Sequence, residues 1–229
     1  MPNYIPVNTL FYSQLTGEVL HGDGVTQFPE TIGEKDTFIT ADYEFYYQKE
    51  FPPFGWRVEV KDRKPTYSTI PAMINGLPVV SLNSTFSGNF ELTEAPEIPP
   101  TIKTMDTAFD GCTSLTKAPK IPVGVESMIG SFSGCTALTE PPLLPDELQY
   151  MMSTFRDCTA LTKAPVIPSR VKWTALAFRG CNSITGPLIC NADPSLLQET
   201  LLGSSITVVS GNCSDKTKRE LLKSKKKAK

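Results

Sequence analysis

Residues 105–122 read MDTAFDGCTSLTKAPKIP, and residues 128–145 read MIGSFSGCTALTEPPLLP. The two stretches align without a gap at a spacing of 23 residues, and the same spacing extends to both sides of them. Each aligned column holds one residue type or a close relative: Phe86, Phe109, Phe132, Phe155 and Phe178; Cys112, Cys135, Cys158 and Cys181; Leu92, Leu115, Leu138, Leu161 and Ile184. A fixed period of this length indicates a solenoid of stacked turns.

A unit of 23 residues is too small to bury its own apolar side chains, so neighbouring units must cover them on both sides. We therefore expect the columns to form internal rows, with the five phenylalanines in one buried row. An amphipathic helix is a poor alternative, because the apolar positions do not recur at three or four residues and prolines interrupt each unit. The pattern predicts about five 23-residue repeats over residues 79–190.

Each repeat is predicted to carry a short strand around L-T-x-A that ends at the first proline. Pro96, Pro119, Pro142 and Pro165 lack an N–H and would leave a gap in a ladder if they lay in mid-strand. A second extended segment is predicted at V-x-x-M, followed by a turn at F-x-G-C. The expected fold class is therefore a mainly β solenoid with short turns.

The columns F-x-G-C-T-x-L and x-I-P-x-x-V over residues 79–190 resemble BspA-like leucine-rich repeats. That family usually reads L-x-x-I-x-I-P, whereas this chain reads LTKAPKIP at residues 115–122. The resemblance implies a leucine-rich-repeat solenoid that acts in recognition or adhesion at the cell surface or outside the cell. Short versions with an aromatic G-W-x-V-x-V segment, as at residues 55–60, also resemble phage or prophage structural and receptor-binding proteins, which implies a virion as the alternative setting.

The cysteine column bears on redox state. Stacked strands lie about 4.8 Å apart, so equivalent cysteines in neighbouring turns come within disulfide range. The first repeat, however, has Asn89 in this column, and Asn cannot form a disulfide. An Asn/Cys exchange is typical of a buried side chain that bonds to loop backbone. We therefore expect reduced, structural thiols at Cys112, Cys135, Cys158 and Cys181, while pairing of Cys190 with Cys213 stays open.

A candidate binding face follows the leucine of each repeat. It consists of Thr93, Thr116, Thr139 and Thr162, each followed by a charged residue, Glu94, Lys117, Glu140 and Lys163. If the leucine points inward, strand alternation turns the threonine outward, and in-register stacking places opposite charges side by side. A solvated strand face explains both rows. A recognition strip for a protein or glycan surface is the functional alternative.

The N-terminal flank differs in composition from the repeats. Residues 37–78 are rich in aromatic side chains, and alternation on either side of a Pro-Pro-Phe-Gly turn predicts a hairpin. We interpret this segment as an N-terminal β cap, with a sugar-stacking platform as the alternative role of its rings. Residues 1–36 are interpreted as an N-terminal arm that forms short strands or an attachment. The single histidine, His21, is expected to be a surface loop residue.

The C-terminal flank is predicted to contain a cap over residues 191–213 and a basic helical tail over residues 214–229. Asp193 and Pro194 suit the start of a helix that would run to Gly203, followed by a last strand at residues 206–209. A second helix would start at Ser214 or Asp215 and fray into the lysine-rich end. These tail lysines are expected to stay solvated.

Charge and motifs narrow the function classes. Residues 215–229 carry a net charge of +6 and the remainder −8, which is unlike a nucleic-acid-binding domain. Neither a secretory signal peptide nor a membrane span is predicted. Patterns for nucleophile elbows, phosphate loops, dinucleotide folds and metal sites are absent, so no enzyme, cofactor or metal is predicted. The expectation is a recognition or adhesion module, with a virion protein and an intracellular scaffold as alternatives.

Overall fold

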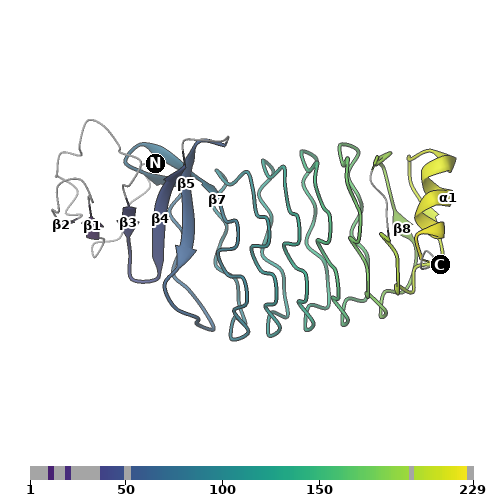
Figure 1. The fold of residues 1–229 in the computed structure, drawn as a ribbon, viewed down its shortest axis with the longest axis horizontal. Coiled ribbons are helices and arrows are strands. Elements are labelled where there is room, and N and C mark those ends of the chain that lie inside the picture. Colours follow the sequence, from purple (N-terminus) through teal and green to yellow (C-terminus); the bar gives the residue numbers. More distant parts are fainter. Residues whose placement is uncertain (1–9, 13–18, 22–36, 49–52, 196–198, 226–229) are drawn as a thin grey trace.

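The computed structural model describes residues 10–12, 19–21, 37–48, 53–195 and 199–225, with side chains described from residue 37 onward. Figure 1 shows an elongated molecule in which narrow turns stack side by side between a β-sheet at one end and helix α1 (Asp215–Lys223) at the other. The predicted solenoid of stacked, mainly β turns is therefore observed. Residues 226–229 of the lysine tail lie outside the described part.

The N-terminal sheet has the strand order β2-β1-β3-β4-β5-β7-β6. Its strands are β1 (Leu10–Tyr12), β2 (Val19–His21), β3 (Thr37–Ile39), β4 (Tyr43–Gln48), β5 (Gly55–Val60), β6 (Met73–Ile74) and β7 (Leu77–Ser81). The predicted hairpin is confirmed, because β4 and β5 pair antiparallel from Tyr43 opposite Val60 to Gln48 opposite Gly55. His21, expected in a loop, lies at the end of β2 opposite Leu10.

Aromatic side chains fill the core of this sheet. Tyr43, Phe45 and Trp56 are at most 1% exposed, and the Trp56 indole donates a hydrogen bond to the carbonyl of Ile74 at 3.1 Å. For these buried rings the sugar-stacking alternative is wrong, since burying them removes apolar area from water and leaves no face for a ligand. Aromatic packing continues into the repeats through Tyr43, whose ring lies 6.5 Å from that of Phe86.

A parallel ladder continues from β7 through successive turns as far as Trp173. Isolated bridges link Ser81 to Thr104 and then, one turn at a time, to Ser127, Tyr150 and Trp173. Each step makes at least two backbone hydrogen bonds across the V-x-x-M segment. In the central step Met128 N donates to Tyr150 O at 2.9 Å, and Gln149 N donates to Glu126 O at 2.8 Å.

The second extended segment, predicted at V-x-x-M, is the one that carries this ladder, whereas the short strand predicted at L-T-x-A is not formed. That segment shows a single parallel bridge, from Lys117 to Glu140, and its regular hydrogen bond joins one threonine to the next, as from Thr162 N to Thr139 O at 3.0 Å. The physical reason is the proline that ends each segment, because it removes the next N–H donor. The V-x-x-M segments contain no proline and keep their donors.

The predicted turn at F-x-G-C packs the five phenylalanines in one row. The rings of Phe86, Phe109, Phe132, Phe155 and Phe178 are fully buried, with neighbouring centroids 5.1–5.8 Å apart and planes within 8° of parallel. Backbone hydrogen bonds join the turns beside them, as from Phe109 N to Ser131 O at 2.8 Å. The glycine that follows has a positive φ, +68° at Gly134, which a residue without Cβ adopts readily.

The predicted helix from Asp193 to Gly203 is wrong over its described part. Residues 199–203 form a turn, and residues 196–198 lie outside the described residues. Thr200 O and Leu202 O accept hydrogen bonds from Phe178 N and Gly180 N at 2.9 and 2.8 Å. These bonds repeat those of the preceding turns, so stacking another turn over Phe178 outweighs the local helix signal.

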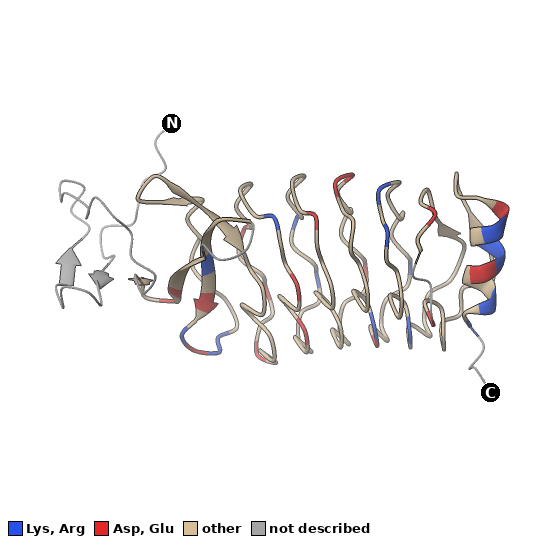
Figure 2. Ribbon diagram, turned by 45° about the horizontal axis from the view of Figure 1, so that its top comes forward, with Lys and Arg blue, Asp and Glu red and all other residues tan. Residues whose placement is uncertain are grey.

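The C-terminal end combines two short strands with α1. β8 (Leu188–Ile189) pairs parallel with β9 (Val209–Ser210), so the predicted last strand at residues 206–209 begins later than expected. The helix predicted to start at Ser214 or Asp215 is confirmed: Ser214 is the N-cap, and its hydroxyl accepts a hydrogen bond from Thr217 N at 3.2 Å. The buried Leu221 attaches the helix to the core. Figure 2 shows basic and acidic residues interspersed along α1.

Candidate functional site

The cysteines have a structural role in the inner rows. All six are free and buried. In each turn the thiol donates a hydrogen bond to the phenylalanine carbonyl of the preceding turn, from Cys112 to Phe86 and from Cys135 to Phe109, both at 3.1 Å, and likewise from Cys158 and Cys181. Burial raises the pKa of the Cys112 and Cys181 thiols to about 12. Neutral thiols are poor nucleophiles, and these four side chains serve to join neighbouring turns.

Asn89 makes the equivalent contact in the first turn. Its side-chain amide donates to the Lys64 carbonyl at 3.0 Å and to the Tyr67 hydroxyl at 2.8 Å. Here the neighbour is a loop of the N-terminal segment and not another turn, and its carbonyl and hydroxyl lie where an amide reaches both. The Asn/Cys exchange in this column therefore preserves a side-chain donor to the neighbouring backbone.

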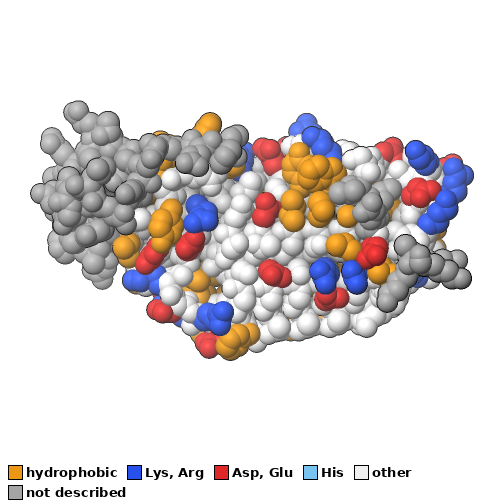
Figure 3. Space-filling view, in the orientation of Figure 1, with side chains coloured by type: hydrophobic (Ala, Val, Ile, Leu, Met, Phe, Trp, Pro, Cys, Tyr) orange, Lys and Arg blue, Asp and Glu red, His pale blue; other side chains and the backbone are white. Residues whose placement is uncertain are grey.

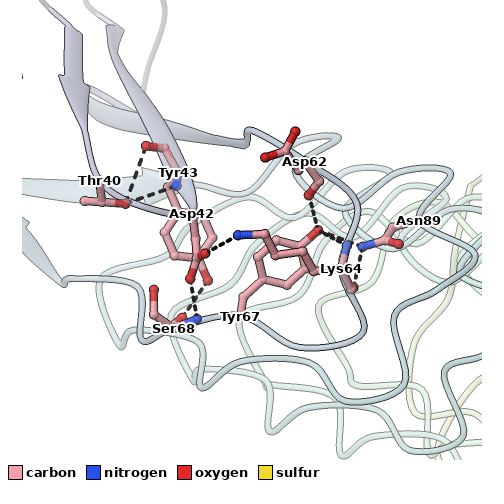
Figure 4. Close-up of polar contacts among 8 residues, drawn as sticks. All are labelled: Thr40, Asp42, Tyr43, Asp62, Lys64, Tyr67, Ser68 and Asn89. Atoms are coloured by element: carbon pink, nitrogen blue, oxygen red, sulfur yellow. Dashed lines mark hydrogen bonds and ion pairs between the residues drawn. The ribbon is translucent and has the colours of Figure 1, made fainter.

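A dense polar network surrounds this junction between the sheet and the first turn (Figure 4). The Asp42 carboxylate accepts hydrogen bonds from Lys64 Nζ at 2.7 Å and from Ser68 N at 2.8 Å. Tyr43 donates its hydroxyl to Ser68 O, and Tyr67 donates its hydroxyl to the carbonyl of Asp62, both at 2.6 Å.

Burial opposes ionisation of Asp42, but the hydrogen bonds from Lys64 and Ser68 outweigh it and lower its pKa to about 2. A low pKa of this origin means that the folded state stabilises the charged carboxylate. Because Lys64 and Ser68 lie in the loop after β5 and Asp42 directly precedes β4, the network fixes the loop against the sheet, and we assign it a structural role.

Within residues 37–48, 53–195 and 199–225, no group of three or more His, Cys, Asp or Glu is arranged to hold a metal ion. Among the residues that the structure describes, no helix has the length and hydropathy that crossing a bilayer requires.

The predicted binding strip lies on the surface. Thr93, Thr116, Thr139, Thr162 and the charged residues Glu94, Lys117, Glu140 and Lys163 are all exposed. Glu140 and Lys163 form an ion pair at 3.0 Å, but both side chains are more than half exposed, and such pairs contribute little to stability. Within the described part of the chain, no ion pair joins Lys117 to Glu94 or Glu140. The threonine hydroxyls bond along the stack, as from Thr162 Oγ1 to Thr139 O at 3.0 Å.

Two shallow hollows lie along this strip. One, of about 450 Å³, is bordered by Thr93, Glu94, Thr116 and Lys117. The other, of about 650 Å³, lies further along the stack between Glu140 and Lys163, and it is lined largely by proline and aliphatic side chains, including Leu143 and Val166. The strip therefore changes along its length, from a polar hollow in the early turns to an apolar hollow in the later ones.

A single column explains this change. The residue before I-P, or its equivalent, is Glu97, Lys120, Leu143, Val166 and Ile189 in successive turns. Leu143 is 93% exposed, Val166 47% and Ile189 40%. We call these three residues the aliphatic row. This row was not predicted from the sequence, although the change from charged to aliphatic residues in one outer column is visible there.

Hydrophobic side chains also gather over the later turns on the face shown in Figure 3, next to Lys and Arg side chains. On the ladder side of these turns, Tyr150 and Trp173 occupy the position that Thr104 and Ser127 hold in the earlier turns. Neither residue lines the hollow beside Leu143. The later turns thus carry two separate exposed apolar clusters.

Comparison with known proteins identifies the fold. No protein-family model matches the sequence, and no curated protein shows significant sequence similarity to it. A leucine-rich repeat protein of T. pallidum has 20% identity and a TM-score of 0.51, over 79% of this chain and 92% of that one. A leucine-rich repeat protein from Bacteroides ovatus has 21% identity and a TM-score of 0.48, over 74% of this chain and 57% of that one. The first similarity, together with the stacked 23-residue turns, shows that this chain has a leucine-rich-repeat fold.

Proposed function

We propose that this protein is a non-enzymatic recognition module that binds a protein partner through the aliphatic row and the adjoining strip. The observation that carries the proposal is the exposure of Leu143, at 93%, in a column where earlier turns carry charged side chains. An isolated exposed leucine is ordinary, but a contiguous apolar patch with a polar border is typical of an interaction site.

The surroundings of the row support a protein partner. The hollow beside Leu143 has a volume of about 650 Å³ and prolines in its wall, and Glu140 and Lys163, which form an exposed ion pair, also line it. An apolar centre with a charged border is the usual arrangement of protein interfaces. The strip extends the surface along the stack to Thr93, so an elongated partner would contact several turns.

Capture of binding partners with matched variants tests the proposal. The double variant Leu143→Asp, Val166→Asp places two charges in the row, whereas Val123→Asp charges a valine that is 75% exposed but does not line the hollow. We expect the double variant to bind a purified, captured partner at least about tenfold more weakly, and Val123→Asp to bind it as the wild type does. Equal affinity of the folded double variant would refute the proposal.

We further propose that the module acts in adhesion at the cell surface. The support is the resemblance of residues 79–190 to BspA-like repeats, and a virion or an intracellular scaffold is the alternative setting. Fractionation of the producing cells, with antibody detection in surface, virion and cytosolic fractions, distinguishes these settings. Detection confined to the cytosol would contradict the surface proposal and leave the binding proposal to its own test.

A further inference from the structure

The aromatic cluster on the ladder side consists of Tyr150 and Trp173 in adjacent turns. Their ring centroids lie 4.7 Å apart, with the planes inclined by 53°. Trp173 is 39% exposed, although large aromatic side chains elsewhere in the turns, such as Phe132 and Phe155, are fully buried. A Trp in this position adds nothing to the inner rows, so its exposed surface is available for a ligand.

A row of polar side chains runs beside the aromatic cluster. It consists of Glu126, Gln149 and Lys172, which directly precede the ladder residues Ser127, Tyr150 and Trp173. Lys172 Nζ donates to Gln149 Oε1 at 2.7 Å, and Gln149 Nε2 donates to Glu126 Oε2 at 3.4 Å. Lys172 Nζ also lies 5.7 Å from the centre of the Tyr150 ring, within the range of a cation–π interaction, so the polar row borders the aromatic cluster at Tyr150.

We propose that Trp173 and Tyr150, together with this polar row, form a binding site for a neutral oligosaccharide. A sugar ring has an apolar face of C–H groups, which packs on an aromatic face, and a border of hydroxyls. The carboxylate, amide and ammonium of the row accept from and donate to those hydroxyls. Because the row contains one acid, one base and one amide, it has no net charge and favours an uncharged ligand.

The size of the cluster favours a sugar over a protein. A stable protein interface needs about 800 Å² from each partner. A large aromatic side chain offers about 150–250 Å² when fully exposed, so Trp173 at 39% exposure presents roughly 100 Å². That area matches one or two sugar rings. The site is also separate from the aliphatic row, so its occupant does not depend on the protein partner proposed above.

The two tryptophans of the chain give a direct assay. Trp56 is 1% exposed, whereas Trp173 is accessible, so iodide quenching of tryptophan fluorescence reports on Trp173. Cellohexaose, maltohexaose and chitohexaose are the probes, each added at millimolar concentration. We expect at least one of them to protect Trp173 from iodide. Calorimetry should show that Trp173→Ala weakens its binding by about tenfold or more, measured at a temperature where the melting curve of the variant shows it to be folded.

Two further variants keep the test decisive. Gln149→Ala retains both rings but interrupts the polar row. We expect it to lower the affinity for the sugar, and the fluorescence of Trp173 still measures binding in this variant. Val123→Asp lies outside the site and should leave sugar binding unchanged. Failure of all three sugars to protect Trp173, or equal affinity of Trp173→Ala, would overturn the proposal. Protection by the protein partner captured through Leu143, without protection by any sugar, would overturn it in favour of a protein occupant.

Discussion

The inner and outer columns of the repeat behave differently along the same stack. The inner phenylalanine column is unchanged over five turns and fully buried. The outer column before I-P changes from Glu97 and Lys120 to Leu143 and Val166. Phe132 and Leu143 belong to the same turn, yet the first is fully buried and the second is 93% exposed.

This difference shows that packing constrains the residue type at inner positions but not at outer ones. A buried ring between two parallel rings tolerates no change in volume without a cavity or a clash. An outer residue contacts mostly solvent, so its substitution usually changes stability little. A consistent change of character in an outer column therefore points to a binding role, whereas constancy in an inner column points to packing.

The largest expected effect comes from truncating the inner row. Phe132→Ala should lower the free energy of unfolding by about 3–5 kcal/mol, because it opens a cavity between Phe109 and Phe155. Leu143→Ala in the same turn should change it by less than about 0.5 kcal/mol. Denaturant unfolding of both variants measures the contrast. Similar losses for the two variants would break the distinction between inner and outer columns.

The second effect concerns the end of the inner row, where Phe86 meets the N-terminal segment. The folded pKa of Asp42, about 2, is lower than its ordinary value of 3.8, so the unfolded chain takes up the proton first as pH falls. The stabilisation, about 2 kcal/mol, is present above pH 3.8 and lost as the pH falls towards 2.

Denaturant unfolding of wild type and Asp42→Asn across this pH range isolates that contribution. The wild type should lose its advantage over the variant as the pH falls, because the variant has no proton to bind at this position. A difference between the two proteins that stays constant with pH would show that the carboxylate is not stabilised by the contacts to Lys64 and Ser68.

A smaller effect on stability is expected from substitutions at the glycine position of the F-x-G-C turn. Asp157 takes the place of this glycine and has a φ of +57°, which strains a residue with a side chain. Asp157→Gly should stabilise the protein by about 0.5–1 kcal/mol, and Gly134→Ala should destabilise it. Thermal melts of both variants test this. A loss of stability in Asp157→Gly would mean that the contact with Arg156 matters more than the strain.

The smallest effect is expected on the charged strip. Lys117→Glu places an acid opposite Glu140 across the single bridge of that segment, and it should cost about 0.5 kcal/mol, which added salt should relieve. Lys117→Gln is the control without a new charge. Melts at low and high salt measure both variants. A large loss that salt does not relieve would place this residue among the inner columns.

The inner architecture was predictable because it follows from the repeat itself. The 23-residue spacing of residues such as Phe109 and Cys112 predicted a stack with internal rows, and the aromatic hairpin and the helix start at Ser214 followed from local patterns. Extended segments were predicted at both L-T-x-A and V-x-x-M, but only the second forms a continuous ladder, because the prolines that end L-T-x-A remove N–H donors. The helix from Asp193 was also wrong, because its local signals were stronger than the weakened repeat signal around Leu201.

The sequence by itself determined the period and which residues face inward, because a 23-residue unit cannot bury its apolar side chains without neighbours on both sides. Only the tertiary structure decided which outer residues gather into surfaces. Val166 follows Leu143 by one period, and Trp173 follows Tyr150 by one period. The path of each turn nevertheless places the first pair beside a hollow and the second on the ladder. The physical reason is that burial constrains every inner position in the same way, whereas outer positions become neighbours only through the stacking of separate turns.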